Sequence, residues 1–354
     1  MRNFLVAVLL LFGVYFLLTH LADVHNVIDT LRRGDWRWLA VGVVFHLAWL
    51  GGLGISLRSI YRLLGIDEYV GRLVLTATAA NFAVVVTPSA GMGGIAVFVS
   101  AGQKRNLSSG RVTAAIGLYI FLDYLATLIL LLAGFVILFR RNQLNGGDIL
   151  ASLVLLGMAI VLGGLLYQGM HSAERLGRAL AWIGNLINRI LRPFLRRDYV
   201  SVAHAYEFSH DATEGLRLAR VRPHGLVLPF AFAMIGKGVW IGILLSMFMA
   251  FRQPLDAGAL IAGYGIGYLF TVVSPTPSGI GFAEGAMTLA LSSLDVPLAA
   301  AALITLAFRG ITLWLTLGYG MLALRWISRA ERPPATASAG GGEDSTRGLR
   351  APKN

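Results

Sequence analysis

Four ionisable residues lie deep inside apolar stretches of this chain: Asp123, Lys237, Glu284 and Arg309. A lone charge at the centre of a membrane helix costs roughly 2.5–3.5 kcal/mol on insertion scales. Such side chains therefore pair with one another, face the interior of a helix bundle or line a wet cavity. Two acids and two bases allow complete pairing, and a buried ion pair that only orients helices is the alternative to a ligand site for each residue.

Glu284 and Arg309 have the sequence context of ligand-binding residues. Glu284 follows a Pro/Gly-rich interruption by about one helical turn, where a carboxylate can bind a cationic group or carry a proton. The guanidinium of Arg309 can hold a phosphate through two parallel hydrogen bonds. We include all four ionisable residues among the expected substrate-binding residues. The alternative of a purely structural ion pair is favoured more for Asp123 and Lys237 than for Glu284 and Arg309.

Two Pro/Gly-rich interruptions supply the elements that would position these charges. Val84 to Gly94 reads VVVTPSAGMGG, and Val272 to Gly281 reads VVSPTPSGIG. Inside lipid, irregular backbone is tolerated only where it is buried in protein or lines a cavity, and paired interruptions in two halves of a chain point to a transporter site. The helix that begins near Ile95 would offer free N–H groups to an anion. The expected binding positions within the interruptions are Pro88, Gly93, Gly94, Pro275, Pro277, Gly279 and Gly281.

The composition predicts an all-α polytopic membrane protein. Hydrophobic residues make up 56% of the 354 residues, charged residues only 14%, and the mean hydropathy is +0.70. A full span needs roughly 20 apolar residues, and six stretches approach or exceed that length: Phe4 to His20, Trp38 to Leu57, Val112 to Phe139, Ile149 to Met170, Gly225 to Phe251 and Leu298 to Leu324.

Four half-length apolar pieces flank the two interruptions. They are Leu73 to Thr87, Ile95 to Gly102, Ala257 to Val273 and Ile280 to Leu294. We interpret each pair as a re-entrant helical hairpin; an ordinary proline-kinked span is the alternative. Asp123 lies 35 residues after Pro88, and Arg309 lies 34 residues after Pro275, which favours an inverted repeat with halves at about 38–139 and 225–325.

The distribution of positive charge predicts the orientation. In this layout 22 Lys and Arg residues fall on the side that carries both termini and six on the other side. Cytoplasmic loops near spans carry the excess of positive charge, so we expect a multi-pass protein of the cell membrane with both termini in the cytoplasm. The first span is preferred to a cleavable signal, because no clear A-x-A site follows it.

Two segments are expected to lie outside the spans. Residues 171–222 contain apolar positions at spacings of three and four from Leu176 to Phe194, typical of an amphipathic helix on the cytoplasmic lipid surface or against the bundle. Residues 331–354 are rich in Pro, Ala, Ser and Gly and are expected to be a disordered tail. Residues 1–330 would then form one transmembrane domain.

Several kinds of chemistry are disfavoured. The chain has no cysteine, so thiolate metal sites and cysteine nucleophiles are excluded. His204, Glu207 and His210 have a metal-like spacing, but residues six apart in a helix do not share a face, and we expect no metal and no cofactor. We interpret His46 as a hydrogen-bonded core residue. Gly263 to Gly267 are better explained by close helix packing than by a dinucleotide loop.

The second interruption and the span after it resemble the flippase-like family that includes the membrane region of lysylphosphatidylglycerol synthase. The matching residues are Pro275, Pro277, Gly279, Gly281, Glu284, Arg309, Thr312 and Trp314, with a looser match at Asn81, Pro88, Gly91, Gly93, Gly94 and Asp123. Many members carry Glu and Arg shortly after the first Pro/Gly run and again before the Asp. This chain has Ala96, Val97 and Phe98 at the first place and Tyr119 and Ile120 at the second.

The resemblance implies a flippase or transporter that moves a phospholipid or lipid-linked amphiphile between leaflets. It implies membrane lipids as partners, with a second copy or a lipid-synthesis enzyme as further candidates, and no nucleic acid. The aminoacyl-transferase domain of the synthase is not expected here, so we expect a transporter rather than an enzyme. The alternatives are a small-solute secondary transporter, a membrane enzyme with Glu284 as base, and an accessory protein of lipid or envelope synthesis.

Overall fold

A computed structural model describes residues 29–86, 92–142, 146–182, 202–274 and 276–329, and these residues form helices and connecting turns without a β-strand. Five helical stretches are long and apolar enough to cross a membrane: Trp36–Leu63, Ser109–Arg140, Gly146–His171, Pro223–Ala250 and Leu298–Trp326. Five of the six predicted spans therefore correspond to helices of membrane-spanning length and apolarity. The sixth, Phe4 to His20, lies outside the described residues, as does the predicted tail.

Eleven α-helices are assigned in the described residues, and most of them are joined by short connections. They are α3 (Trp36–Leu63), α4 (Val70–Val86), α5 (Met92–Gln103), α6 (Ser109–Arg140), α7 (Gly146–His171), α9 (Val202–Val221), α10 (Val227–Ala250), α11 (Ala257–Val273), α12 (Phe282–Ser293), α13 (Leu298–Arg309) and α14 (Leu315–Arg329). Short 3₁₀ turns precede α10 (Pro223–Leu226) and α12 (Pro277–Gly279), and a π-helical turn, Gly310–Trp314, joins α13 to α14.

Side-chain caps explain where several helices begin. The Asp35 carboxylate accepts a hydrogen bond from the amide of Arg37 at 3.0 Å before α3, and Ser108 accepts one from Arg111 at 3.3 Å before α6. Asp256 accepts from the amides of Gly258 and Ala259 at the start of α11. These contacts satisfy amides that have no partner within the helix.

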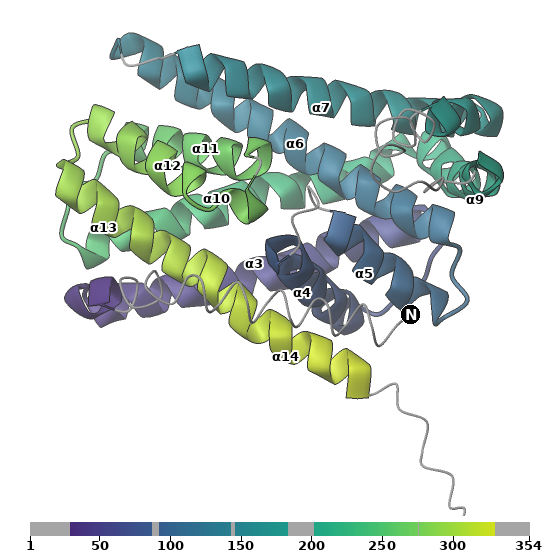
Figure 1. Cartoon of the computed structure of the whole chain (residues 1–354), viewed down its shortest axis with the longest axis horizontal. Coiled ribbons are helices and arrows are strands. Elements are labelled where there is room, and N and C mark those ends of the chain that lie inside the picture. Colours follow the sequence, from purple (N-terminus) through teal and green to yellow (C-terminus); the bar gives the residue numbers. More distant parts are fainter. Residues whose placement is uncertain (1–28, 87–91, 143–145, 183–201, 275, 330–354) are drawn as a thin grey trace, which may run out of the picture.

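The half-length helices pack in pairs, α4 with α5 and α11 with α12. Figure 1 shows α11 and α12 at one end of the molecule and α4 and α5 nearer the other. A Cβ at Gly267 of α11 would lie 3.1 Å from the Cβ of Met287 of α12, so the glycines of α11 allow the close packing that we predicted. The C-terminal end of α4 packs against the second interruption and against α14. Phe82, Val85 and Val86 of α4 form one apolar cluster with Ile280 of the interruption and with Leu313 and Leu317 of the last span.

The long helices surround these pairs. In Figure 1, α6 and α7 run side by side along one edge, and α3 and α14 lie toward the opposite edge. Antiparallel α3 and α10 form the most extensive helix pair in the bundle. One apolar core is formed by helices α10, α11, α12 and α13 together with α6 and α7. A second core is formed by α3, α4, α5 and α6 together with α9.

Part of the segment between α7 and α10 is helical. Residues 173–182 are helical, with Leu176 buried and with Arg175 and Arg178 exposed. The rest of the predicted helix, to Phe194, lies outside the described residues. Our pattern analysis did not predict α9, whose Ala212 and Leu216 are buried against the second core.

Candidate functional site

The four deep charges form two separate ion pairs. Glu284 in the first turn of α12 accepts from the Nε of Arg309, the last residue of α13, at 2.6 Å. The Nζ of Lys237 on α10 lies 2.8 Å from Asp123 Oδ1 on α6. The complete pairing that the sequence allowed is confirmed, and it joins residues that are 25 and 114 positions apart.

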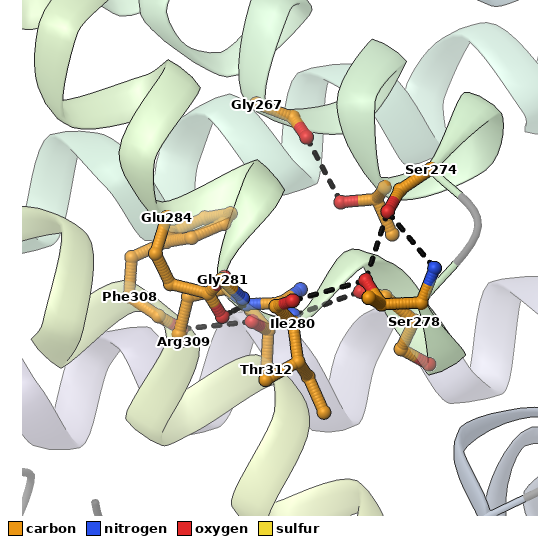
Figure 2. Close-up of polar contacts among 11 residues, drawn as sticks. Gly267, Ser274, Ser278, Ile280, Gly281, Glu284, Phe308, Arg309 and Thr312 are labelled. Atoms are coloured by element: carbon orange, nitrogen blue, oxygen red, sulfur yellow. Dashed lines mark hydrogen bonds and ion pairs between the residues drawn. The ribbon is translucent and has the colours of Figure 1, made fainter.

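The Glu284 and Arg309 pair is part of a network that holds the second interruption, shown in Figure 2. A guanidinium nitrogen of Arg309 donates to the carbonyl of Ser278 at 2.8 Å, and the amide of Gly281 donates to Glu284 Oε2 at 2.7 Å. The hydroxyl of Thr276 donates to the carbonyl of Ile280 at 2.9 Å. These bonds satisfy backbone groups that a continuous helix would have paired internally.

The backbone of the interruption uses conformations that favour glycine. Gly279 and Gly281 have φ values of +70° and +84°, and Ser278 between α11 and α12 has a φ of +50°. A Cβ at Gly279 would lie 2.6 Å from the Cα of Thr271, which is too close for any other residue. Pro277 opens the 3₁₀ turn, whereas Pro275 lies outside the described residues.

We expect Gly279→Ala to lower the apparent melting temperature of the purified protein more than Gly281→Ala does. Both positions have positive φ, which costs an L-residue about 1–2 kcal/mol, but no heavy atom lies within 4 Å of a Cβ at Gly281. Only Gly279→Ala adds a clash with backbone. Thermal unfolding in detergent, followed by fluorescence, measures the difference, and equal shifts for the two variants would contradict this account.

A π-helical turn follows Arg309 directly. Gly310–Trp314 interrupts the stretch that we predicted as one regular span from Leu298 to Leu324. The hydroxyl of Thr312 donates to the carbonyl of Phe308 at 2.8 Å inside this turn. Single π-turns within α-helices occur frequently at functional sites. This one lies next to Arg309, which is hydrogen-bonded to the second interruption.

The second pair, Asp123 and Lys237, is more deeply buried. The Lys237 side chain is 5% exposed and the Asp123 side chain 18%. The hydroxyl of Tyr268 donates to Asp123 Oδ2 at 2.5 Å, and the Lys237 ammonium lies 3.8 Å from the centre of the Tyr268 ring. A carboxylate and an aromatic face are both favourable for an ammonium group.

This pair lines a cavity of about 370 Å³. Residues of α3, α6, α10 and α11 form the walls, and the polar or aromatic ones are Trp49, Ser56, Tyr119, Asp123, Phe232, Lys237, Trp240 and Tyr268. The cavity extends to the outer surface of the bundle, since its lining residues Ile55 and Ile235 are 42% and 58% exposed. Both belong to helices that are long and apolar enough to span a membrane.

An aromatic layer lies between the two ion pairs. The rings of Tyr268 and Tyr264 on α11 are 5.9 Å apart between centres, and Tyr264 lies 6.4 Å from Phe308. Trp240 contacts Phe308 at 5.9 Å. Phe308 precedes Arg309, so ring contacts connect the wall of the cavity to the interruption.

His46 is a buried core residue, as predicted. Its Nε2 is hydrogen-bonded to the hydroxyl of Tyr319, and Thr316 lies 3.4 Å from the same nitrogen. Its ring packs against Trp49 and Trp240, which line the cavity. Within the described part of the chain, His46 Nδ1 has no hydrogen-bond partner.

The first interruption is only partly visible. Pro88 lies outside the described residues, while Gly93 and Gly94 belong to the first turn of α5, which begins at Met92 rather than near Ile95. The predicted anion contact at this helix end stays a prediction. Among the described residues no cluster of three potential metal ligands occurs, and the side chains of His204 and Glu207 are not among those described.

Four cavity residues were missed by the sequence analysis: Trp49, Ser56, Trp240 and Tyr268. Trp49 and Ser56 lie seven positions apart, two turns along one face of α3, but this spacing is equally typical of a packed apolar face. Nothing in their local sequence relates them to Asp123.

Comparison with known families gives one match. The model of the family described as "Lysylphosphatidylglycerol synthase TM region" matches residues 4–320. No curated protein matches the chain.

Proposed function

The chain belongs to the family of the lysylphosphatidylglycerol synthase TM region, which links it to lipid and envelope metabolism, and we propose that it moves a phospholipid or a lipid-linked amphiphile between the leaflets of the membrane. The observation that carries this proposal is the cavity with Asp123 and Lys237 on its wall and Ile55 and Ile235 at its exposed side. A lipid could place its headgroup against the charges while its acyl chains stay in the bilayer.

We propose that α4 with α5 and α11 with α12 are re-entrant hairpins of an inverted repeat. Each helix of these pairs has 12 or 17 residues and is shorter than a full span, and each pair flanks an interruption. The end of α4 packs against the second interruption. In secondary transporters, interrupted helices of this kind meet near the bilayer midplane and bind the substrate there. In the predicted layout, Lys and Arg are in excess on the side that carries both termini, which supports termini in the cytoplasm and a location in the cell membrane.

We propose a transporter rather than an enzyme. Asp123 and Glu284, the carboxylates among the four deep charges, are both held in ion pairs, so neither is arranged as a free general base. Glu284 and Arg309 would control the second interruption during transport, with Arg309 as the predicted phosphate contact once its pairing opens. A second copy of the chain or a lipid-synthesis enzyme would be the partner.

The proposal predicts leaflet exchange by the purified protein. Liposomes that contain the wild-type protein should exchange a headgroup-labelled phospholipid between leaflets faster than protein-free liposomes, as measured by chemical quenching of the label in the outer leaflet. The assay uses anionic, zwitterionic and aminoacylated lipids in turn. Absence of exchange for every lipid, together with uptake of a water-soluble substrate, would instead identify a small-solute transporter.

A further inference from the structure

The charges on the cavity wall cancel. Asp123 and Lys237 are the ionisable acid and base among the residues that line the cavity, and they neutralise each other at 2.8 Å. The side chain of Lys237 is almost completely buried, so a ligand that separates the pair must supply a new partner for each charge. Removing one partner of a buried pair is strongly destabilising because the other charge is left uncompensated.

The Lys237 ammonium occupies a place that a ligand ammonium would suit equally well. It donates to Asp123 and lies over the ring of Tyr268, whose hydroxyl donates to the second oxygen of the same carboxylate. Trp49 and Trp240, which contact each other at 5.2 Å, line the same cavity. Lysine has a flexible four-carbon stem, so its ammonium can leave this place without movement of the helix.

The cavity also contains an unused hydrogen-bonding group. Ser56 on α3 is 3% exposed and lines the cavity, and its hydroxyl has no hydrogen-bond partner among the described residues. A buried hydroxyl without a partner is unusual, because buried polar groups are nearly always hydrogen-bonded. If the Ser56 side chain turned toward the cavity, a ligand oxygen there would supply the missing acceptor.

Charge balance then selects the class of ligand. An anionic headgroup that takes Lys237 leaves Asp123 without a cation, and a cationic headgroup that takes Asp123 leaves Lys237 without an anion. A headgroup with one phosphate and one ammonium leaves neither charge unpaired. A primary ammonium, unlike a quaternary one, can also donate the hydrogen bond that Lys237 now makes to Asp123.

We infer that the cavity binds the headgroup of a zwitterionic phospholipid with a primary ammonium. The ligand ammonium replaces Lys237 Nζ between Asp123 and Tyr268, and the ligand phosphate replaces Asp123 as the partner of Lys237. Ser56 donates to an oxygen of the same headgroup. The presence of a lipid in the cavity rests on the proposed function; the choice of headgroup rests on the cavity itself.

The test is lipid competition on the purified full chain. Native mass spectrometry of the protein with equimolar phosphatidylethanolamine, phosphatidylcholine and phosphatidylglycerol of matched acyl chains measures which lipid is retained. We expect phosphatidylethanolamine to be retained about tenfold more than the other two, the factor that corresponds to 1.4 kcal/mol. Equal retention of the three lipids, or preference for phosphatidylglycerol, would overturn the inference.

Variants make the test specific to the ion pair. In Asp123→Asn, Lys237 is left free, and we expect the preference to change to phosphatidylglycerol. The neutral double variant Asp123→Asn/Lys237→Met keeps a similar volume and no unpaired charge, and we expect it to fold and to lose the preference. An unchanged preference in either variant would contradict the exchange of partners.

A pair of serine variants provides a matched control. Ser56 and Ser152 both have buried hydroxyls without a partner in the described structure, but Ser152 lies on α7 and does not line the cavity. We expect Ser56→Ala to lower phosphatidylethanolamine retention about fivefold, within the range of one hydrogen bond, and Ser152→Ala to leave it unchanged. Equal effects of both changes would exclude the Ser56 contact.

The binding and exchange assays separate this inference from the proposed function. Selective binding of phosphatidylethanolamine without leaflet exchange would support the headgroup site and contradict transport. Leaflet exchange at equal rates for all three lipids, without selective binding, would support transport and contradict the headgroup site.

Discussion

Arg309→Ala is expected to abolish leaflet exchange and to lower the stability of the protein by about 3–5 kcal/mol, the usual cost of removing one partner of a buried ion pair. The change leaves Glu284 without its cation and the carbonyl of Ser278 without its donor. Both losses fall at the interruption between two apolar helices, where water cannot easily replace the protein partner. Exchange in liposomes and thermal unfolding in detergent measure the two effects.

Glu284→Gln is the matched control for this prediction. Glutamine has nearly the same shape, and its amide oxygen can still accept from the amide of Gly281, so the start of α12 is preserved. We expect exchange to be lost while the yield of folded protein stays nearly intact, because Arg309 keeps its hydrogen bond to the carbonyl of Ser278, which Arg309→Ala removes. A collapse of the yield would show that the pair with Arg309 is structural and would count against a role of Glu284 in transport.

Lys237→Met is expected to have the second large effect, a loss of about 3–5 kcal/mol of stability, because the Asp123 carboxylate would keep, among the described residues, only the Tyr268 hydroxyl as a hydrogen-bond partner. Methionine fills the space of the lysine stem, so the loss would come from the unpaired carboxylate rather than from a void. The shift of the apparent melting temperature relative to the wild type measures it.

The neutral double variant Asp123→Asn/Lys237→Met should recover most of that stability. Replacement of both partners of a buried pair by uncharged side chains is often neutral or stabilising, whereas removal of one is not. The double variant should nevertheless exchange lipid poorly, because no charge remains to hold a headgroup. A double variant as unstable as Lys237→Met would mean that the two charges do not act as a pair.

The two charged sites are positioned to influence each other through α11. This helix carries Tyr264 and Tyr268 beside the cavity and ends at Val273, directly before the second interruption. Tyr264 contacts Phe308, the neighbour of Arg309, and the π-helical turn follows at Gly310. A displacement of α11 on headgroup binding would therefore reach the network around Glu284 through packed side chains.

Much of the architecture follows from the sequence, because lipid imposes strong local rules. Long apolar runs can satisfy their backbone in a membrane only as helices, so the runs from Trp38, Val112, Ile149, Gly225 and Leu298 predicted the five helices of membrane-spanning length that the structure contains. The same argument identified the interruption at Pro277 and Gly279, and charge neutrality among four deep residues anticipated two ion pairs. Each inference needs only neighbouring residues or the cost of a buried charge.

The partners and the cavity were decided only by the tertiary structure. The zero net charge of the four deep residues does not specify whether Lys237 pairs with Asp123 or with Glu284, because the pairing depends on which helices cross at the same depth. Trp49, Ser56 and Tyr268 reach the cavity from helices far apart in the chain, and their types and spacings are those of ordinary packed helix faces. The π-helical turn after Arg309 was also invisible in the sequence, because it is one extra residue in an otherwise regular apolar span. Local physics therefore determined the elements and the number of charges, whereas the long-range packing of α3, α6, α10 and α11 determined which of those side chains share a site.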